Sequence, residues 1–129
     1  MAVSVEEIHS YACTLANEAQ EVVLRTAVSR AYYSAFHACR KWHAALPTPG
    51  RNAGAGGGIH QDLINQLGNP DPKLSAKLTA QSRQTAARLK DLKDVRTLAD
   101  YSISSGELDT YAAAQACLLA RAIISSLDT

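Results

Sequence analysis

Aromatic side chains are scarce in this chain of 129 residues: only 5% are Phe, Trp or Tyr, although 47% are hydrophobic. A core without many large rings has to be built from Ala, Leu, Val and Ile in close contact. This composition favours packed helices, because sheets are enriched in β-branched and aromatic residues. We find no strand-like alternation and no internal repeat. The sequence therefore predicts an all-α protein.

Long apolar runs are absent as well. No stretch approaches the roughly 20 apolar residues that a membrane-spanning helix needs. The first residues include Glu6 and Glu7, where a signal peptide would carry Lys or Arg. The three cysteines, Cys13, Cys39 and Cys117, stand far apart among apolar neighbours, as reduced thiols in a core do. We expect a cytoplasmic chain that does not interact with a membrane.

Signatures of metal, cofactor and nucleophile sites are also missing. There is no C-x-x-C, no H-E-x-x-H and no E-x-x-H of the kind that di-iron bundles use. The Gly-rich segment is not followed by the Gly-Lys-Ser/Thr of a P-loop, and no strand precedes it. No G-x-S-x-G turn is present either. We expect neither a metal nor a cofactor.

Helix-breaking residues divide the chain into segments of a single domain, residues 1–129. Pro47 and Pro49 end a long second helix, because proline has no amide hydrogen to continue it. The segment 47–58 holds five of the seven glycines, and ordering it would be entropically costly, so we expect a flexible loop. The predicted helices span about 5–17, 19–46, 59–67, 73–101 and 106–127. They predict an up-and-down bundle of four to five helices.

Two of these helices begin with the pattern of a capping box, in which two side chains satisfy backbone amides at the helix start. Ser4 and Glu7 form this pattern in the first helix, and Ser104 and Glu107 form it in the last.

The second predicted helix has one apolar and one polar face when its residues are placed at intervals of about 100°. The apolar stripe consists of Leu24, Val28, Ala31, Ala35, Ala38, Trp42 and Leu46. Because small alanines let a neighbouring helix approach closely, we expect this helix to be central. The opposite stripe consists of Thr26, Arg30, Tyr33, His37 and Lys41.

Arg30 and His37 are two turns apart on this polar stripe. An arginine and a histidine held together could stabilise a phosphate and transfer a proton, as a metal-independent ribonuclease requires. Alternatively, the stripe is a solvated face or a dimer contact. The sequence leaves both interpretations open.

The fourth predicted helix carries an arginine among its apolar residues. Its stripe consists of Leu74, Leu78, Leu89, Leu92, Ala99 and Ile103, and the same projection places Arg96 within it. A buried guanidinium must be paired, and Asp100, one turn later, is the nearest candidate; Tyr101 could complete the network. The pair could lock two helices or a dimer seam, or Arg96 could grip a phosphate.

The fourth predicted helix is also basic: residues 73–96 hold seven Lys and Arg but only two Asp. This charge is the one electrostatic hint of a polyanionic partner, but a solvated outer face, partly balanced by the acidic first helix, is the favoured interpretation. His60, which follows the Gly-rich loop, is another histidine that we expect near an accessible edge.

Two stretches resemble those of small HEPN proteins. Ser29 to Ala38 reads S-R-A-Y-Y-S-A-F-H-A and is similar to a motif on the second helix of that family; Arg96 to Tyr101 reads R-T-L-A-D-Y and is similar to its R-x-x-A-D-Y. His60 after a Gly-rich loop also fits. The resemblance implies a dimerising helical bundle of prokaryotic toxin–antitoxin pairs or phage defence, with a minimal nucleotidyltransferase as a possible partner.

Many HEPN proteins are endoribonucleases whose R-x(4-6)-H motifs from two subunits form one active site. Here the positions where that histidine should follow Arg96 hold Tyr101, Ser102 and Ile103, so the motif is broken. We therefore expect a non-catalytic dimeric module that binds RNA, a nucleotide or a partner protein. The alternatives are a ribonuclease that uses Arg96 with Tyr101 or Arg30 with His37, and a structural adaptor. The candidate binding residues are Arg30, Tyr33, His37, His60 and Arg96; the catalytic candidates are Arg96, Asp100, Tyr101, Arg30 and His37.

Overall fold

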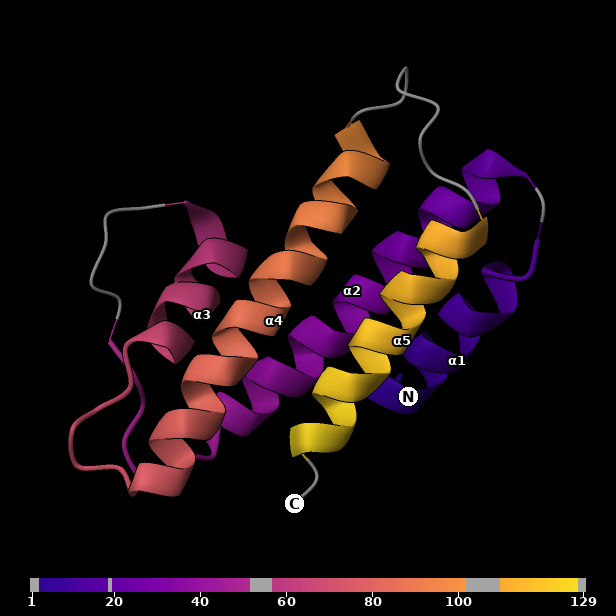
Figure 1. Cartoon of the computed structure of the whole chain (residues 1–129). Coiled ribbons are helices and arrows are strands. Elements are labelled where there is room, and N and C mark those ends of the chain that lie inside the picture. Colours follow the sequence, from indigo (N-terminus) through magenta and orange to yellow (C-terminus); the bar gives the residue numbers. More distant parts are fainter. Residues whose placement is uncertain (1–2, 19, 52–56, 102–109, 128–129) are drawn as a thin grey trace.

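The computed structural model describes residues 3–18, 20–51, 57–101 and 110–127, which form five helices and no strand. The helices are α1 (Val5–Leu15), α2 (Glu21–Ala44), α3 (Gly58–Gly68), α4 (Ala76–Tyr101) and α5 (Thr110–Leu127). The all-α prediction is confirmed. In Figure 1, α1 runs antiparallel to α2, α4 runs antiparallel to α5, and α3 lies along the flank of α4. None of the described helices has the length and apolar character needed to cross a bilayer.

The start of α1 has the predicted capping box. The amide of Glu7 donates to Ser4 Oγ at 3.1 Å, and the amide of Ser4 donates to Glu7 Oε1 at 3.3 Å. Two amides that the first helical turn leaves unpaired are therefore satisfied. The second predicted box, Ser104 with Glu107, lies outside the described residues.

α4 begins three residues later than the sequence predicts. The amide of Lys73 donates to Asp71 Oδ1 at 2.8 Å in a turn before the helix. Ser75 Oγ then accepts from the amide of Leu78 at 3.2 Å. A serine immediately before the first helical residue caps the helix in this way, so α4 starts at Ala76 and not at Lys73.

α2 is the central helix, as predicted, because it packs against each of the other four. Ala31 and Ala35 are fully buried on it, as are Ala113 and Ala120 on α5. Small side chains at these positions let helix axes approach closely. Along the predicted apolar stripe, the first four residues are buried and the last three, from Ala38 onward, are half-buried.

The cysteines lie in or against the core, as expected from their apolar neighbours. Cys39 and Cys117 are buried and Cys13 is half-buried; none of the three is in a disulfide. Burial raises the pKa of Cys39 to about 12, and burial with the nearby Cys13 thiol raises that of Cys117 to about 12. The reactive form of cysteine is the thiolate, so Cys39 and Cys117 are held as unreactive thiols.

The chain after α2 is anchored before it reaches the glycine-rich segment. The amide of Gly50 donates to His43 Nε2 at 2.9 Å, and the amide of Arg51 donates to the Asn69 carbonyl at 3.2 Å. Burial lowers the pKa of His43, which keeps its ring neutral and able to accept. Of the predicted flexible loop, residues 52–56 lie outside the described residues, whereas Gly50 and Arg51 are held against the end of α3.

We predict that Gly50→Ala destabilises the protein. A Cβ at Gly50 would lie 1.9 Å from the Gln66 carbonyl oxygen of α3, so the backbone would have to move and the His43 contact would be lost. We expect the free energy of unfolding to fall by about 1–3 kcal/mol, measured by urea denaturation.

Gly68→Ala is the matched control for this measurement. A Cβ at Gly68 would meet only the Ala86 methyl group, at an ordinary 3.7 Å. Its stability should equal or exceed that of the wild type. Equal losses in the two variants would show that the Gly50 contact does not anchor the chain.

Candidate functional site

Tyr32 of α2 is the centre of a group of charged and aromatic side chains drawn from three helices. Its side chain is fully buried, and its hydroxyl lies 3.0 Å from His60 Nδ1 of α3. The His60 ring also packs on the Tyr32 and Phe36 rings, with centroids 5.4 and 4.4 Å away. We call the group the cation–aromatic cluster; it comprises Arg30, Tyr32, Tyr33, Phe36, His37, His60, Lys93 and Arg96.

The hydrogen bond between Tyr32 and His60 defines the tautomer of the imidazole. Burial raises the pKa of the Tyr32 phenol, so the hydroxyl keeps its proton. Within the described residues, His60 Nδ1 is the hydrogen-bond partner of this hydroxyl. We assign the hydroxyl as the donor to Nδ1, which places the proton of the neutral imidazole on Nε2.

His60 is neutral near pH 7. Burial lowers its pKa below the ordinary value of 6.5, and the positive charges of Arg96 and Lys93 and the nearby His37 lower it further. A neutral imidazole with its proton on Nε2 offers one N–H donor outward from the Tyr32 contact. His60 can thus hydrogen-bond to an anion or a carbonyl, although it carries no charge of its own.

Arg96 is half-buried and paired with Asp100, and the ion pair is the one that the sequence predicts. Its side chain is only 15% exposed, and its Nε lies 2.8 Å from Asp100 Oδ2. This contact is an ion pair without the alignment of a hydrogen bond, since the buried Nε has no hydrogen-bond partner among the described residues. The guanidinium carbon lies 5.5 and 5.8 Å from the centroids of the Tyr32 and Tyr33 rings. Arg96 therefore packs against two tyrosines while one carboxylate balances its charge.

Arg30 and His37 meet on one side of α2 through Tyr33. The guanidinium carbon of Arg30 lies 4.6 Å from the Tyr33 centroid, and the His37 ring centroid lies 6.2 Å from it. Arg30 and His37 are exposed and Tyr33 is half-buried. The predicted proximity of Arg30 and His37 is thus mediated by the half-buried ring of Tyr33.

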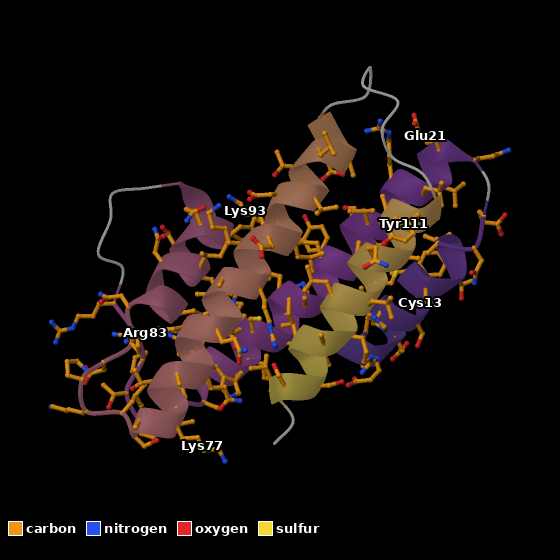
Figure 2. The ribbon with its side chains drawn as sticks, in the orientation of Figure 1. Cys13, Glu21, Lys77, Arg83, Lys93 and Tyr111 are labelled. Atoms are coloured by element: carbon orange, nitrogen blue, oxygen red, sulfur yellow. The ribbon has the colours of Figure 1, made fainter. Side chains whose placement is uncertain are left out.

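Lys93 extends the cluster toward α3. Its ammonium donates to the uncharged Gln61 Oε1 at 3.1 Å, and among the described residues Lys93 has no ion-pair partner. Figure 2 shows Lys93 on the side of α4 that faces α3, whereas Arg83 and Lys77 belong to the lower part of α4. Of the basic residues of α4, Lys77, Arg83 and Lys90 are exposed, whereas Arg88, Lys93 and Arg96 are half-buried.

Arg25 of α2 holds the part of α4 that carries Arg96. Its guanidinium nitrogen Nη1 donates to the carbonyls of Leu98 and Ala99 at 3.2 and 2.8 Å. These carbonyls belong to the last turn of α4, where intrahelical partners run out. Glu21 balances the charge through a contact of 3.4 Å to Nε. Arg25 is therefore a positioning residue for Arg96 and Asp100.

The structure brings together most of the residues that the sequence singled out. Arg30, Tyr33, His37, His60 and Arg96 all lie in the cluster, and Asp100 pairs with Arg96. The side chain of Tyr101 lies outside what the structure describes. No histidine follows Arg96 at the R-x(4-6)-H spacing, but the fold brings His60 of α3 onto the same tyrosine ring as Arg96.

Sequence reasoning missed Tyr32, Phe36, Lys93 and Arg25 as members or supports of the site. Tyr32 and Phe36 belong to the motif S-R-A-Y-Y-S-A-F-H-A, but neither lies on the polar stripe from which the candidate residues of α2 came. The available signal was the aromatic content of this motif, because it holds three of the few aromatic residues of the chain.

The fold and this cluster define the chain as an all-helical bundle with a partly buried site of cations and aromatic rings. Among the described residues, no group of three His, Cys, Asp or Glu side chains could hold a metal ion. No family model, curated protein or solved structure matches the chain. The chemistry of the site is therefore inferred from its own geometry.

We predict that His60 titrates below pH 6.5 and that Tyr32→Phe raises its pKa, because the variant removes the hydroxyl that stabilises the neutral ring. Protonation of His60 disfavours the folded state, so its contribution to stability is full above pH 6.5 and is lost as the pH falls through the folded-state pKa. We expect Tyr32→Phe to lower stability by about 0.5–1.5 kcal/mol.

The measurement is an NMR titration of the His60 ring protons. Tyr33→Phe serves as the control, because its ring contacts His60 with no hydroxyl hydrogen bond to it. If Tyr33→Phe moves the His60 pKa as much as Tyr32→Phe does, the tautomer assigned above is wrong.

Proposed function

We propose that this chain is a non-catalytic, HEPN-like module that binds single-stranded RNA at the cation–aromatic cluster. The observation that carries the proposal is the half-exposed Tyr33 ring, which two guanidiniums approach: Arg30 at 4.6 Å and Arg96 at 5.8 Å. Proteins bind single strands by combining cationic side chains for phosphates with aromatic side chains on which bases stack. The cluster holds both at one accessible place.

The distribution of charge supports a polyanionic ligand. The net charge of the chain is only +1, yet Arg30, Lys93 and Arg96 converge around Tyr33 and His60. Asp100 balances Arg96, whereas Lys93 has an uncharged partner. A phosphodiester would meet two guanidiniums, an ammonium and the Nε2–H of His60. Such contacts release counterions, so binding should weaken steeply with salt.

The resemblance to HEPN proteins supports the wider setting of this proposal. It implies a prokaryotic homodimer in a toxin–antitoxin or defence system, possibly paired with a minimal nucleotidyltransferase, and we include this setting in the proposal. An RNA ligand is consistent with a cytoplasmic location.

We predict that Arg30→Ala weakens binding of a fluorescently labelled single-stranded RNA 12-mer about tenfold and lowers the salt slope by about one. The guanidinium of Arg30 is exposed, so its removal should leave the fold intact. Fluorescence anisotropy at several salt concentrations measures both quantities.

Arg83→Ala is the matched control, because Arg83 is exposed on α4 and lies 13 residues, or about 20 Å, along the helix from Arg96. We expect its affinity to stay within about twofold of wild type. Equal losses in Arg30→Ala and Arg83→Ala would mean that RNA binds a diffuse basic surface and not the cluster.

A second candidate function is RNA cleavage, and the position of His60 beside Arg96 favours it. A ribonuclease of this kind would have His60 take the proton of the ribose 2′-hydroxyl as that oxygen attacks phosphorus, while Arg96 stabilises the phosphorane charge. In the tautomer assigned above, Nδ1 accepts from Tyr32 and Nε2 carries the proton. The ring has no free lone pair in this tautomer, and its lowered pKa makes the protonated acid scarce. The geometry therefore supports binding better than cleavage.

We predict that the purified protein leaves a single-stranded RNA intact in the presence of EDTA. The products are examined on denaturing gels for strands that end in a 2′,3′-cyclic phosphate. Cleavage that disappears in His60→Ala, but persists in His37→Ala, would replace the binding proposal with the catalytic one. Intact RNA with wild-type affinity supports the binding proposal.

A further inference from the structure

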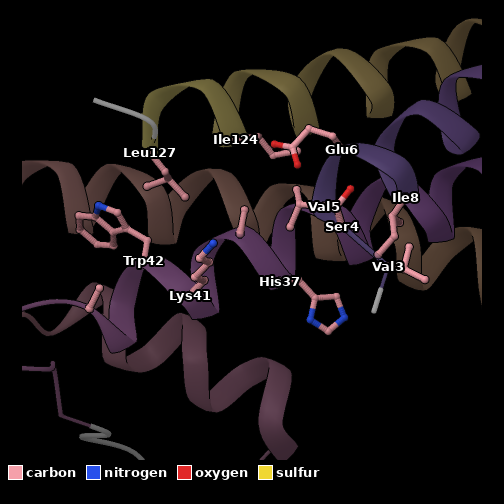
Figure 3. Close-up of a pocket in the computed structure, with 12 residues that line it drawn as sticks. Val3, Ser4, Val5, Glu6, Ile8, His37, Lys41, Trp42, Ile124 and Leu127 are labelled. Carbon is pink, nitrogen blue, oxygen red and sulfur yellow. The ribbon is translucent and has the colours of Figure 1, made fainter. Parts of the chain in front are cut away.

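A cavity of about 690 Å³ opens beside the cation–aromatic cluster. Its walls come from the start of α1, the second half of α2 and the end of α5 (Figure 3). The apolar lining includes Ile8, Trp42, Ile124 and Leu127. Sites that hold small organic molecules have volumes of roughly 300–1,000 Å³ and a mostly apolar lining with a few polar groups. This cavity has both properties.

The polar groups of the cavity lie at its rim. His37 and Lys41 come from α2, and Glu6 comes from α1. In Figure 3, Trp42, Lys41 and His37 follow one another along α2, and Glu6 lies across the cavity near Ile124. Lys41 attracts an anion to the α2 rim, whereas Glu6 repels it from the opposite rim.

His37 belongs both to this cavity and to the cation–aromatic cluster. Its ring packs on Tyr33 and Phe36, with centroids 6.2 and 5.4 Å away, and it also lines the cavity. Arg30, His37 and Lys41 are all exposed on this side of α2. The 11 residues from Arg30 to Lys41 span about 16 Å of helix. A continuous strip of donors and cations therefore leads from the cluster to the cavity.

We propose that the cavity receives a base of the same RNA strand that the cluster binds, stacked on Trp42, with the adjoining phosphate at Lys41. This inference rests on the proposed function and extends it to a site several nucleotides long. Trp42, a half-buried residue of the lining, offers an aromatic ring for the flat face of a base, and stacking on aromatic side chains is tolerant of sequence. The cation beside Trp42 and the acid on the far rim direct the phosphate to the α2 side.

The chain carries its own reporter for this site, because Trp42 is its only tryptophan. The full-length protein is titrated with the single-stranded oligonucleotide rA8, and Trp42 emission and anisotropy of a labelled rA8 are recorded in parallel. We expect rA8 to quench Trp42 with the same midpoint as the anisotropy change. Lys41→Ala should raise the midpoint about fivefold.

Lys73→Ala is the matched control for Lys41→Ala, because it removes an exposed lysine that lies outside both the cavity lining and the cluster. Its midpoint should remain within about twofold of wild type. Equal midpoints for the two variants would overturn the placement of a phosphate at Lys41.

The two measurements also separate this inference from the proposed function. If anisotropy reports binding that depends on Arg30 while Trp42 emission stays constant, the cavity is not part of the RNA site and only the further inference fails. If neither signal changes, both proposals fail.

If Trp42 emission changes on dilution of the protein without RNA, a second copy of the chain covers the cavity and the inference is wrong. Quenching by AMP but not by rA8 would likewise overturn it, because the site would then take a free nucleotide.

Discussion

The hydrogen bond between the buried Tyr32 hydroxyl and His60 is the constraint on which the rest of the site depends. It joins α2 to the first turn of α3, next to the glycine-rich connection, and the tautomer of the imidazole is assigned from it. A buried hydroxyl without a partner is costly, so this bond favours one position of α3 against α2. The guanidinium of Arg96 packs against the same Tyr32 ring, 5.5 Å from its centroid. The cations of the cluster are therefore arranged around a side chain that is itself part of the core.

The charges of the site are balanced only in part, and this balance decides what kind of ligand it suits. Asp100 holds Arg96 in an ion pair, and a second anion near Arg96 would have to share that guanidinium. Arg30 stacks on Tyr33 and Lys93 bonds to a neutral amide, so these two remain available to a phosphate. A single small anion would gain little from such an arrangement. A chain of phosphates, each meeting a different cation, fits it better.

Much of this architecture can be predicted from local patterns in the sequence. The capping box at Ser4, the break at Pro47 and the alanine stripe of α2 depend on nearby residues, and the structure confirms them. The pairing of Arg96 with Asp100 was also predictable, because both residues lie on one helix, one turn apart. α3 ends one residue later and α4 begins three residues later than predicted, since turn and capping contacts compete there with helix propensity.

The composition of the site was less predictable, because it depends on contacts between helices. A helical projection assigns one buried face to α2, yet a central helix is buried on a second flank as well, where Arg25, Tyr32 and His43 lie. His60 and Arg96 are 36 positions apart on α3 and α4 and meet on the Tyr32 ring of α2, so their proximity depends on the packing of three helices. The residues that neighbour Arg96 in the sequence include no histidine that would indicate this contact.

The grip of Arg25 on the last turn of α4 has a consequence for how the site opens. The carbonyls of Leu98 and Ala99 accept hydrogen bonds from Arg25 of α2, so this turn can fray only if those hydrogen bonds break. Asp100 lies in the same turn, and its release would free Arg96 from its counter-ion. Fraying of this helix end would therefore change the net charge of the site. Slow amide exchange in the last turn of α4 should mark the intact turn, in which Asp100 neutralises Arg96.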